Sequence, residues 1–580
     1  MGTSNEEVAR LLEELAALTM LDEGRPDSFR VRAYHNAQRA VQGLETEVAE
    51  LSATQLAAVK GIGSSIAGRI REYVDTGRIE RLEQLREQHP PEQLALLKVP
   101  GLGPKTVAML DRELGVRDVE GLVAALAEGR VAELPGMGER SAGKLREAVE
   151  QLGLGSKQRR VPLADALPVA ERLLAAVREV PGVVDAALGG SVRRFREDIG
   201  DVDVLVASDD ASPVHEAMLA LPEVERTLGS GPTKTSVVTR DGVQLDLRVV
   251  TPESFGAALV YFTGSKAHNI RLRQRALERE LSLNEYALVR QHDEQVVASR
   301  TEQEVYAALD LPWIPPELRE DDGELEAADA DELPRLPEVD DLRGDLHDHT
   351  DRSGDGRDPL DVLVSAAVER GLEYLAITDH AEDLRINGVS RADMLEQRRE
   401  LRDLEQRRGD IRLLHGAELN IGVDGDLDYD AEFLAGFDWL VASVHSHFGR
   451  GVREQTDRIV AAMREPSVTA IGHLTGRLLG RRPGIELDLD VVLDAAVETG
   501  TAIEINASLQ RLDAPVGVIR EGHRRGVRFV ISTDAHAVED LERARFGIAQ
   551  ARRARLPAEA VANTWPTSRF LAWVDEVRSA

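Results

Sequence analysis

Two aspartates stand two residues apart in the stretch "GGSVRRFREDIGDVDVLV" at residues 189–206. The run "VDVLV" has the β-branched content of a buried strand, and side chains alternate faces along a strand, so Asp201 and Asp203 point the same way. Two like charges on a largely buried strand repel each other unless a cation lies between them. A divalent metal ion is the obvious candidate for that cation.

A third carboxylate completes this pair. Asp246 stands alone between Leu245 and Leu247 in "GVQLDLRVV", on a second predicted strand. Three carboxylates can hold two metal ions about 4 Å apart, one activating an attacking hydroxyl and one supporting the leaving phosphate. The pattern therefore favours phosphoryl transfer, although a structural cation site or surface acids at a strand end would give the same DxD spacing.

The residues before the aspartates are those that a triphosphate needs. Gly189, Gly190 and Ser191 would let backbone N–H groups approach the phosphates, because glycine adds no side chain at the turn. Arg193 and Arg194 are nearby cations of the kind that offset phosphate charge.

A second set of candidate ligands is spread over the last part of the chain. It comprises nine residues: His347, His349, Asp355, His380, Glu418, His445, His473, Asp534 and His536. This number is too large for one tetrahedral ion and suits two or three Zn²⁺ or Mn²⁺ ions. Asp379, which precedes His380, and His447 are interpreted as partners that orient ligands. A single histidine at a strand end is usually structural, but a set recurring at successive strand ends is not.

Seven predicted strands, each followed by a helical pattern, must position these ligands. They are "GDLHDH", "YLAITDH", "RLLHGAELN", "DWLVASVHSH", "TAIGHL", "TAIEIN" and "RFVISTDAH". Most end in His, Asp or Glu, and barrels carry their chemistry at the carboxyl ends of the strands. Seven such units indicate a barrel rather than an open sheet.

The first third of the chain is helical by pattern and contains one small repeat three times. The copies are "VKGIGSSIAGRI" (59–70), "VPGLGPKTVAML" (99–110) and "LPGMGERSAGKL" (134–145). Each joins an apolar residue, Gly-x-Gly and a helix start, which is the arrangement of a helix-hairpin-helix that grips one phosphate backbone. The candidate DNA-binding glycines are Gly61, Gly63, Gly101, Gly103, Gly136 and Gly138. Three ordinary helix–helix turns are the alternative, which the matching flanks disfavour.

Between these regions the pattern becomes mixed α/β from about residue 160 to 255, and a helical stretch follows to about 315. The run "REDDGELEAADADELPRLPEVDD" at 319–341 is predicted to be an acidic, loosely packed linker.

Composition narrows the class of protein. At 580 residues the chain needs several domains, and its 42% apolar and 30% charged content is typical of a folded protein. There is no cysteine, which excludes disulfides and thiolate chemistry, and no apolar run approaches the roughly 18 residues of a membrane span. A cytoplasmic, nucleoid-associated protein is expected.

A net charge of −32 is unusual for a nucleic-acid binder, but the charge is unevenly distributed along the chain. Residues 1–160 carry 22 basic and 25 acidic side chains, a net of −3, whereas residues 301–360 carry 5 and 20, a net of −15. Much of the excess lies outside the predicted DNA-binding repeats, so the charge does not exclude a basic groove elsewhere.

Four motifs between residues 190 and 265 carry a family resemblance. Gly-Ser-x-Arg-Arg (190–194), Gly-Asp-x-Asp (200–203), Asp246 and "YFTGS" (261–265) together resemble the family X DNA polymerases over roughly residues 1–318. The resemblance implies that Asp201, Asp203 and Asp246 bind catalytic Mg²⁺ or Mn²⁺, with Asp246 as the base for the primer 3′-OH. It further implies a set of nucleotide-binding residues: Gly190, Ser191, Arg194, Tyr261, Phe262, Gly264, Asn269 and Arg273.

One position departs from the family. Relatives with deoxyribose-phosphate lyase activity use a lysine in the helix after the first hairpin, where "GIGSSIAGRIREYV" has Arg69. A guanidinium is always protonated and cannot form the Schiff base, so the resemblance does not extend to that activity.

The nine-ligand set resembles the PHP (polymerase and histidinol phosphatase) domain, a distorted seven-stranded barrel that hydrolyses phosphoesters. The match covers about residues 342–575. The family usually has Ser-Asp-Gly where this chain has "SGDG", so Gly354 is inserted and Asp355 is the candidate third ligand. The resemblance implies an active centre with two or three Mn²⁺ or Zn²⁺ ions.

A multidomain chain follows from these interpretations: helical hairpins, an α+β nucleotidyltransferase palm and thumb, and a (β/α)7 barrel. The predicted bounds are 1–90 and 91–158 for the helical regions, 159–255 for the palm, 256–318 for the thumb, 319–341 for the linker and 342–580 for the barrel. This order resembles the bacterial and archaeal polymerase X proteins.

The predicted function is a repair polymerase, expected to be a monomer, that fills short gaps in nicked or gapped duplex DNA with dNTPs, and whose PHP domain is a 3′–5′ exonuclease. Two alternatives remain: a nucleotidyltransferase fused to a small-molecule phosphatase such as a histidinol phosphatase, and a DNA-end scaffold without catalysis. The hairpins disfavour the first alternative, and the intact ligand sets disfavour the second.

Overall fold

The computed structural model divides the chain into two compact units, residues 1–159 and 160–580. It describes residues 5–579 except 24–27, 43, 45, 47, 90–92, 94–95, 98, 100–101, 135–136, 139–140, 146–159 and 385. Among these described residues no helix is long and apolar enough to cross a membrane.

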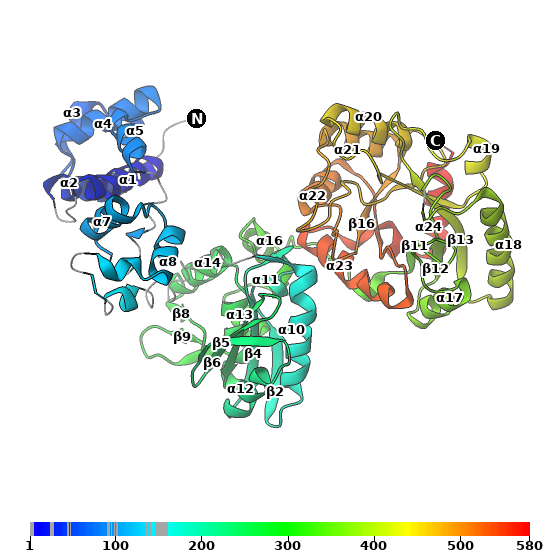
Figure 1. Cartoon of the computed structure of the whole chain (residues 1–580), viewed down its shortest axis with the longest axis horizontal. Helices are drawn as coiled ribbons and strands as arrows, with labels where there is room; N and C mark the ends of the chain where they lie inside the picture. The colour runs from blue at the N-terminus through cyan, green and yellow to red at the C-terminus, as the bar shows by residue number, and fades with distance from the viewer. Residues whose placement is uncertain are drawn as a thin grey trace. The chain divides into compact units, whose positions relative to one another are not determined.

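The first unit is helical, as the periodicity predicts (Figure 1). Its helices are α1 (Asn5–Glu23), α2 (Phe29–Gln42), α3 (Ala53–Ala58), α4 (Ser64–Thr76), α5 (Glu80–Gln88), α7 (Pro104–Leu114) and α8 (Val119–Ala127), with 3₁₀ turns η1 (Val48–Glu50) and η2 (Arg130–Glu133). They enclose two apolar cores, one built on Leu12, Leu15 and Ile70 and the other on Val107, Leu110 and Leu122. Each core includes residues of the helix that follows a Gly-x-Gly turn, α4 in the first core and α7 in the second.

A five-stranded sheet forms the palm at the start of the second unit. The elements are β1 (Val161–Pro162), α10 (Leu163–Arg178), β2 (Val183–Leu188), α11 (Gly190–Arg193), β3 (Asp198–Ile199), β4 (Val202–Ser208), α12 (Ser212–Leu219), β5 (Val224–Ser230), β6 (Lys234–Thr239) and β7 (Gln244–Val250). The strand order is β2-β4-β7-β6-β5, and only β4 and β7 run parallel. One face of the sheet packs against α10 and α12. On the other face, Leu205 and Ala207 pack against the helix that begins at Phe255.

The next region holds η3 (Pro252–Ser254), α13 (Phe255–Thr263), α14 (Lys266–Leu277), β8 (Leu281–Leu283), β9 (Leu288–Arg290), β10 (Val296–Ala298), α15 (Glu302–Ala307) and η4 (Pro316–Leu318). The expected helical stretch thus contains a small antiparallel sheet of order β10-β9-β8. Its first turn is fixed by Asn284, whose Oδ1 accepts the backbone N–H groups of Tyr286 and Ala287. Such an Asx turn breaks a helix and starts a hairpin.

The acidic segment 319–341 is packed rather than loose, which corrects the linker prediction. It contains α16 (Glu324–Asp329) and η5 (Val339–Asp341), and the side chains of Arg319 and Glu324 are fully buried. Its carboxylates are matched by basic groups: Glu324 contacts His268 at 2.6 Å, and Asp322 contacts Arg520 at 2.5 Å. From the sequence, an acidic run is interpreted as a solvated linker because its basic partners lie far away along the chain.

The prediction of a seven-stranded barrel is confirmed. The strands β11 (Gly344–Asp348), β12 (Tyr374–Ile377), β13 (Arg412–Asn420), β14 (Trp439–Ser443), β15 (Ala470–Ile471), β16 (Ala502–Asn506) and β17 (Phe529–Ser532) are hydrogen-bonded in chain order, all parallel. The two outer strands come together where Asp348 bridges Ala535, so the barrel is nearly closed.

Helices surround these strands in Figure 1. They are α17 (Leu360–Glu369), α18 (Arg391–Arg408), α19 (Ala431–Leu434), α20 (Val452–Met463), α21 (Leu489–Thr499), α22 (Val516–Arg525), α23 (Ala544–Arg553) and α24 (Thr567–Val577), with η6 (Val538–Arg543), η7 (Ala558–Ala560) and η8 (Ala562–Thr564). Phe570 of α24 stacks on Tyr374 at the amino end of β12, with ring centroids 4.5 Å apart. This cover leaves the carboxyl ends of the strands available for chemistry.

Candidate active sites

The palm brings two of the three predicted aspartates into direct register. Asp203 on β4 pairs with Asp246 on the parallel strand β7, and Asp201 immediately precedes β4. Parallel neighbours in register project their side chains to the same face, so Asp203 and Asp246 stand side by side.

Electrostatics in this cluster fit the binding of a cation. Burial, together with the negative charges of Asp201 and Asp246, raises the pKa of Asp203 to about 7. Lys234 on β6 offsets part of the charge, since its Nζ lies 2.6 Å from Asp246 Oδ2. Oxygen-only donors of this kind suit Mg²⁺ or Mn²⁺, so the residues present fit the metals that the sequence predicts.

The Gly-Gly turn passes directly against the aspartates. Gly190 has a φ of +57°, and a Cβ on it would lie 2.4 Å from Asp203 Oδ2. A Cβ on Gly189 would lie 2.8 Å from Leu205. Both positions therefore need glycine, one for its backbone conformation and both for space.

The arginines that follow the turn are already paired. Arg193 forms a bidentate ion pair with Glu302 at 2.8 and 2.9 Å. Arg194 contacts Glu320 Oε1 at 2.9 Å and also donates to the backbone oxygen of Thr263. Arg194 is thus held beside the turn by the acidic segment, and a triphosphate would have to share it with Glu320.

The predicted nucleotide residues of α13 and α14 form one connected group. The rings of Tyr261 and Phe262 meet edge to face at 5.0 Å, and the Arg248 guanidinium lies over Phe262 at 4.4 Å. Asn269 donates to the backbone oxygen of Tyr261 at 2.6 Å, and Arg273 stands one turn further along α14, exposed. Ser191 is partly buried in α11, and a Cβ on Gly264 would lie 3.2 Å from Arg194.

The barrel collects the predicted ligands at the carboxyl ends of its strands. His347 lies on β11 and Glu418 on β13, while the others follow strands: His349 and Asp355 after β11, His380 after β12, His445 after β14, His473 after β15, and Asp534 and His536 after β17. All nine predicted residues therefore lie at one end of the barrel.

Glu418 lies at the centre of this cluster. Its Oε1 is 3.0 Å from His445 Nε2 and 2.9 Å from His473 Nε2. Its Oε2 is 2.9 Å from His380 Nδ1 and 3.4 Å from His347 Nε2. A carboxylate that faces imidazoles with both oxygens is suited to bridge two metal ions.

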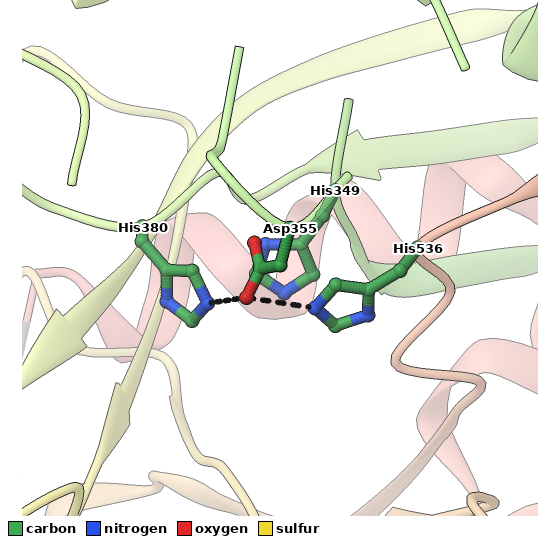
Figure 2. Close-up of side chains that lie close together, drawn as sticks. All are labelled: His349, Asp355, His380 and His536. Carbon is green, nitrogen blue, oxygen red and sulfur yellow. Dashed lines mark hydrogen bonds and ion pairs between the residues drawn. The ribbon is translucent and has the colours of Figure 1, made fainter. Parts of the chain in front are cut away.

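A second group of ligands forms around Asp355, and Figure 2 shows that His349, His380 and His536 converge on it. Asp355 Oδ2 lies 3.2 Å from His380 Nε2 and 3.5 Å from His536 Nε2. The inserted Gly354 makes this possible, since a Cβ there would lie 2.8 Å from Asn387 Oδ1. Asn387 in turn donates to Asp355 at 2.6 Å.

The pKa shifts of the barrel histidines also fit the binding of cations. Burial lowers the pKa of His349, and neighbouring imidazoles lower it further. Burial alone would also lower the pKa of His380, but Glu418 and Asp355 outweigh it and raise that pKa to about 10. Both ring nitrogens of His349 are buried with no hydrogen-bond partner among the described residues. Ring nitrogens left over in this way fit metal coordination.

The structure places at this cluster one further acid that the sequence analysis did not select. Glu504 on β16 accepts a hydrogen bond from His347 Nδ1 at 2.7 Å and from the backbone N–H of His473 at 2.6 Å. A lone acid within "AIEIN" is the same signal that identified Asp246 on its strand. Of the two partners predicted to orient ligands, Asp379 binds Thr350 and Gln397, while exposed His447 contacts Ser446.

The Gly-x-Gly repeats form the same turn wherever the structure describes them. The backbone oxygen of Gly63 accepts N–H groups of Ile66 and Ala67, both at 2.9 Å. The corresponding oxygen of Gly103 accepts Thr106 and Val107 at 2.9 and 3.0 Å, and that of Gly138 accepts Ser141 and Ala142 at the same distances. Gly61 has a φ of +105°, whereas Gly101 and Gly136 lie outside the described residues. Arg69, near Tyr34, donates to Ser65.

Four family models match the chain in the order that the sequence predicts. They are a helix-hairpin-helix domain at residues 3–79, a SAM-like helix-hairpin-helix tandem at 94–151, the DNA polymerase beta thumb at 258–320 and the PHP domain at 345–508.

A curated relative covers nearly the whole chain. The DNA polymerase/3′-5′ exonuclease PolX of Bacillus subtilis (strain 168) is 36% identical over 552 residues, which are 94% of this chain and 95% of that protein. The chain belongs to the PHP-containing family X DNA polymerases. The resemblance found in the sequence is thereby confirmed, and membership together with the hairpin domains implies that the chain binds DNA.

Two further relatives match parts of the chain. DNA polymerase lambda of Rattus norvegicus is 24% identical over 343 residues, covering 53% of this chain and 56% of that protein. A probable phosphatase of Vibrio campbellii is 30% identical over 211 residues, covering 34% of this chain and 80% of that protein. One of these relatives is named as a DNA polymerase and the other as a probable phosphatase, in keeping with the separate thumb and PHP models that match the chain.

Proposed function

We propose that this family X polymerase fills short gaps in duplex DNA at its palm and removes 3′ nucleotides at its barrel. The observation that carries the proposal is that one chain holds two separate acid-rich centres. One is a pair of aspartates in register beside a Gly-Gly turn, and the other is a cluster of imidazoles around Glu418. Three hairpins for gripping a phosphate backbone precede both centres.

Each centre has residues to hold its ions. Asp201, Asp203 and Asp246 would hold Mg²⁺ or Mn²⁺ in the palm, and the nine barrel residues would hold two or three Mn²⁺ or Zn²⁺ ions. When bound, divalent ions at both sites supply Lewis acidity that activates an attacking oxygen and offsets charge on the phosphate.

The chain's own groups account for the remaining steps in the palm. The Gly189–Gly190 turn leaves room for a phosphate against Asp203. Asp246 accepts the proton of the primer 3′-OH, and Lys234 Nζ lies 2.6 Å from its Oδ2. Tyr261 and Phe262 pack against the sugar, which selects deoxyribonucleotides over ribonucleotides.

In the barrel, the side-chain oxygens of Glu504 and Asn420 set the orientation of two imidazole rings. Glu504 holds His347 at Nδ1, which leaves Nε2 facing Glu418. Asn420 Oδ1 faces His445 Nδ1 at 2.8 Å and leaves Nε2 of that ring facing Glu418 as well. Fixed ring orientations of this kind keep a metal site assembled.

A primer-extension assay tests both halves. A 5′-labelled primer on gapped DNA is incubated with Mg²⁺ or Mn²⁺, with and without dNTPs, using wild type, Asp203→Ala and His349→Ala. We expect Asp203→Ala to lose about 10³-fold in extension and to keep shortening, and His349→Ala to show the reverse.

The barrel's similarity to a probable phosphatase provides the competing function. Extension without shortening in any metal, together with hydrolysis of free phosphomonoesters, would assign the barrel to small molecules instead. If the wild type neither extends nor shortens the primer, the protein only binds DNA and the proposed function is wrong.

A further inference from the structure

The palm and the barrel share an ion pair that leads into the barrel's active end. Glu197 follows the palm's α11, and both of its carboxylate oxygens bind Arg477 of the barrel, at 2.9 and 3.1 Å. Arg477 is only 12% exposed, so this pair is well shielded from solvent. Gln550 of α23 donates to the same carboxylate at 3.3 Å.

Arg477 also binds the backbone of a loop in the barrel. Its Nε donates to the backbone oxygen of Arg511 at 2.9 Å, and its terminal nitrogen donates to that of Leu512. These carbonyls belong to the loop after β16, residues 507–514. Leu512 in this loop has a φ of +42°, a conformation that needs support from its surroundings, and its side chain packs into the palm's apolar core.

The same loop carries a guanidinium to the metal-ligand cluster. Arg511 Nε lies 3.7 Å from Oδ2 of Asp534. Its NH1 is buried and has no hydrogen-bond partner among the described residues. A buried donor without an acceptor is costly, and a phosphate oxygen is the acceptor that a phosphoester site would bring.

We propose that Glu197 of the palm is a positioning residue of the barrel's phosphoester site. Glu197 fixes Arg477, Arg477 fixes the 507–514 loop, and the loop holds Arg511 where its free donors contact the substrate phosphate beside Asp534. Arg511 is then a catalytic residue, and the barrel's substrate binding depends on the attached palm. The inference rests on the proposed phosphoesterase function of the barrel.

A second ion pair between palm and barrel provides a matched control. Glu171 of α10 binds Arg545 of α23 through both oxygens, at 2.6 and 3.2 Å. This pair is more exposed, and neither residue contacts the 507–514 loop in the contacts described for the chain. Loss of Glu171 therefore removes an equivalent domain contact without touching Arg511.

The test uses the full-length chain loaded with Mn²⁺ and compares wild type, Glu197→Ala, Glu171→Ala, Arg511→Gln and the Glu197→Ala/Arg511→Gln double variant. Calorimetry measures the binding of inorganic phosphate to the loaded chain and the binding of Mn²⁺ to the metal-free chain. Steady-state kinetics on a 3′-terminal DNA substrate gives kcat and KM.

We expect Arg511→Gln to weaken phosphate binding and raise KM by about 10-fold or more, as for loss of a charge-assisted hydrogen bond. Glu197→Ala should lose a similar factor, while Glu171→Ala and the Mn²⁺ affinity of every variant stay near wild type. The double variant should be no worse than Arg511→Gln alone, because Glu197 acts through Arg511. Glu197→Gln keeps one acceptor oxygen and should be intermediate.

Equal losses in Glu171→Ala, or additive losses in the double variant, would overturn the proposal. If Glu197→Ala fails to fold, the Glu197→Gln comparison decides in its place. A wild type that binds phosphate but does not shorten DNA would reject the proposed exonuclease, and the phosphate measurements would still decide the role of Glu197.

Discussion

The palm and the barrel both place acids at parallel strands, but they balance the charge differently. In the palm, Lys234 and Arg248 offset only part of the charge of the carboxylates, and burial together with Asp201 and Asp246 raises the pKa of Asp203 to about 7. In the barrel, imidazoles alternate with carboxylates, and Glu418 is surrounded by histidines that lower its pKa well below the usual value despite its burial. The charge of the palm carboxylates therefore needs added cations to balance it, whereas the barrel carboxylates are already balanced by the neighbouring histidines.

This difference matches the two chemistries. A polymerase site must accept a new nucleotide and its accompanying Mg²⁺ at each cycle, so a partly open carboxylate cluster is useful. A hydrolytic site needs the same ions for every turnover, and mixed nitrogen and oxygen donors retain them. The predictions below test whether this contrast holds.

After loss of Asp203 itself, the largest effect is expected at the palm's glycine turn. Gly190→Ala would place a Cβ 2.4 Å from Asp203 Oδ2, in a residue with a φ of +57°. Displacing a metal-binding carboxylate by even 1 Å should lower single-nucleotide incorporation by about 10²-fold. Barrel hydrolysis should not change.

Gly182→Ala is the matched control for this substitution. Gly182 has a φ of +89° in the turn before β2, but a Cβ there meets nothing within 4 Å. Its alanine variant should be less stable and equally active. A Gly190→Ala enzyme with a normal incorporation rate would show that the palm tolerates movement of its aspartates.

In the barrel, the corresponding change is Glu504→Gln. The amide removes the charge beside His347 Nδ1 and places an N–H₂ or a weaker acceptor opposite the His473 backbone N–H. Outer partners of metal ligands are worth about 10- to 100-fold, so hydrolysis should fall in that range while extension is retained.

Exposed Glu498 on α21 is the control for Glu504. Glu498→Gln should leave both activities and the Mn²⁺ affinity unchanged. If Glu504→Gln hydrolysed DNA at the wild-type rate, the barrel's ring orientations would not depend on β16.

The two centres should also separate by pH. The raised pKa of Asp203, about 7, means that this carboxyl is protonated below neutral pH, and Mg²⁺ must displace the proton. The apparent Mg²⁺ affinity measured by extension should therefore fall about tenfold per pH unit below 7 and level off above it.

The barrel should behave differently over the same range. His380, with a pKa of about 10 before metal binds, keeps its proton through neutral pH. Metal loading of the barrel should thus continue to improve above pH 7, where the palm has levelled off. Calorimetric titration with Mn²⁺ at several pH values checks this, and identical profiles for the two centres would remove the contrast.

The sequence indicated which side chains gather in the barrel better than it indicated their surroundings. The barrel histidines could be selected because each lies in or just after an apolar strand, and that periodicity is local. Glu504 shows the same local signal but was not assigned, since its role depends on meeting His347 across the barrel. The inserted Gly354 before Asp355 departs from the usual family motif, and the reason for it is visible only beside Asn387.

The acidic segment shows the limit of sequence reasoning most clearly. Its composition indicates a solvated linker, yet Glu320 binds Arg194 and Asp322 binds Arg555, far away in the chain. Ion pairs between distant residues leave no periodic pattern, and neither does the small β8–β10 sheet, whose strands have three residues each. Such features depend on tertiary contacts that local propensity does not encode.

The smallest expected effect concerns the contact between Lys234 and Asp246 in the palm. Lys234 Nζ lies 2.6 Å from Asp246 Oδ2 and is 38% exposed, so it competes with a metal ion from a partly solvated position. Lys234→Gln should tighten Mg²⁺ binding at pH 8 by about 2- to 5-fold, the range of an exposed ion pair.

At pH 6 the same substitution should lose this advantage. The ammonium of Lys234 helps to lower the pKa of Asp203, so its removal leaves more of that carboxyl protonated in acid and unavailable to Mg²⁺. The wild-type and variant affinity curves should therefore approach or cross below pH 7, whereas Arg240→Gln, an exposed charge change on the same hairpin, should follow wild type throughout. Weaker Mg²⁺ binding by Lys234→Gln at pH 8 would mean that the lysine holds Asp246 in place for the metal, and the palm would then be preassembled in the same sense as the barrel.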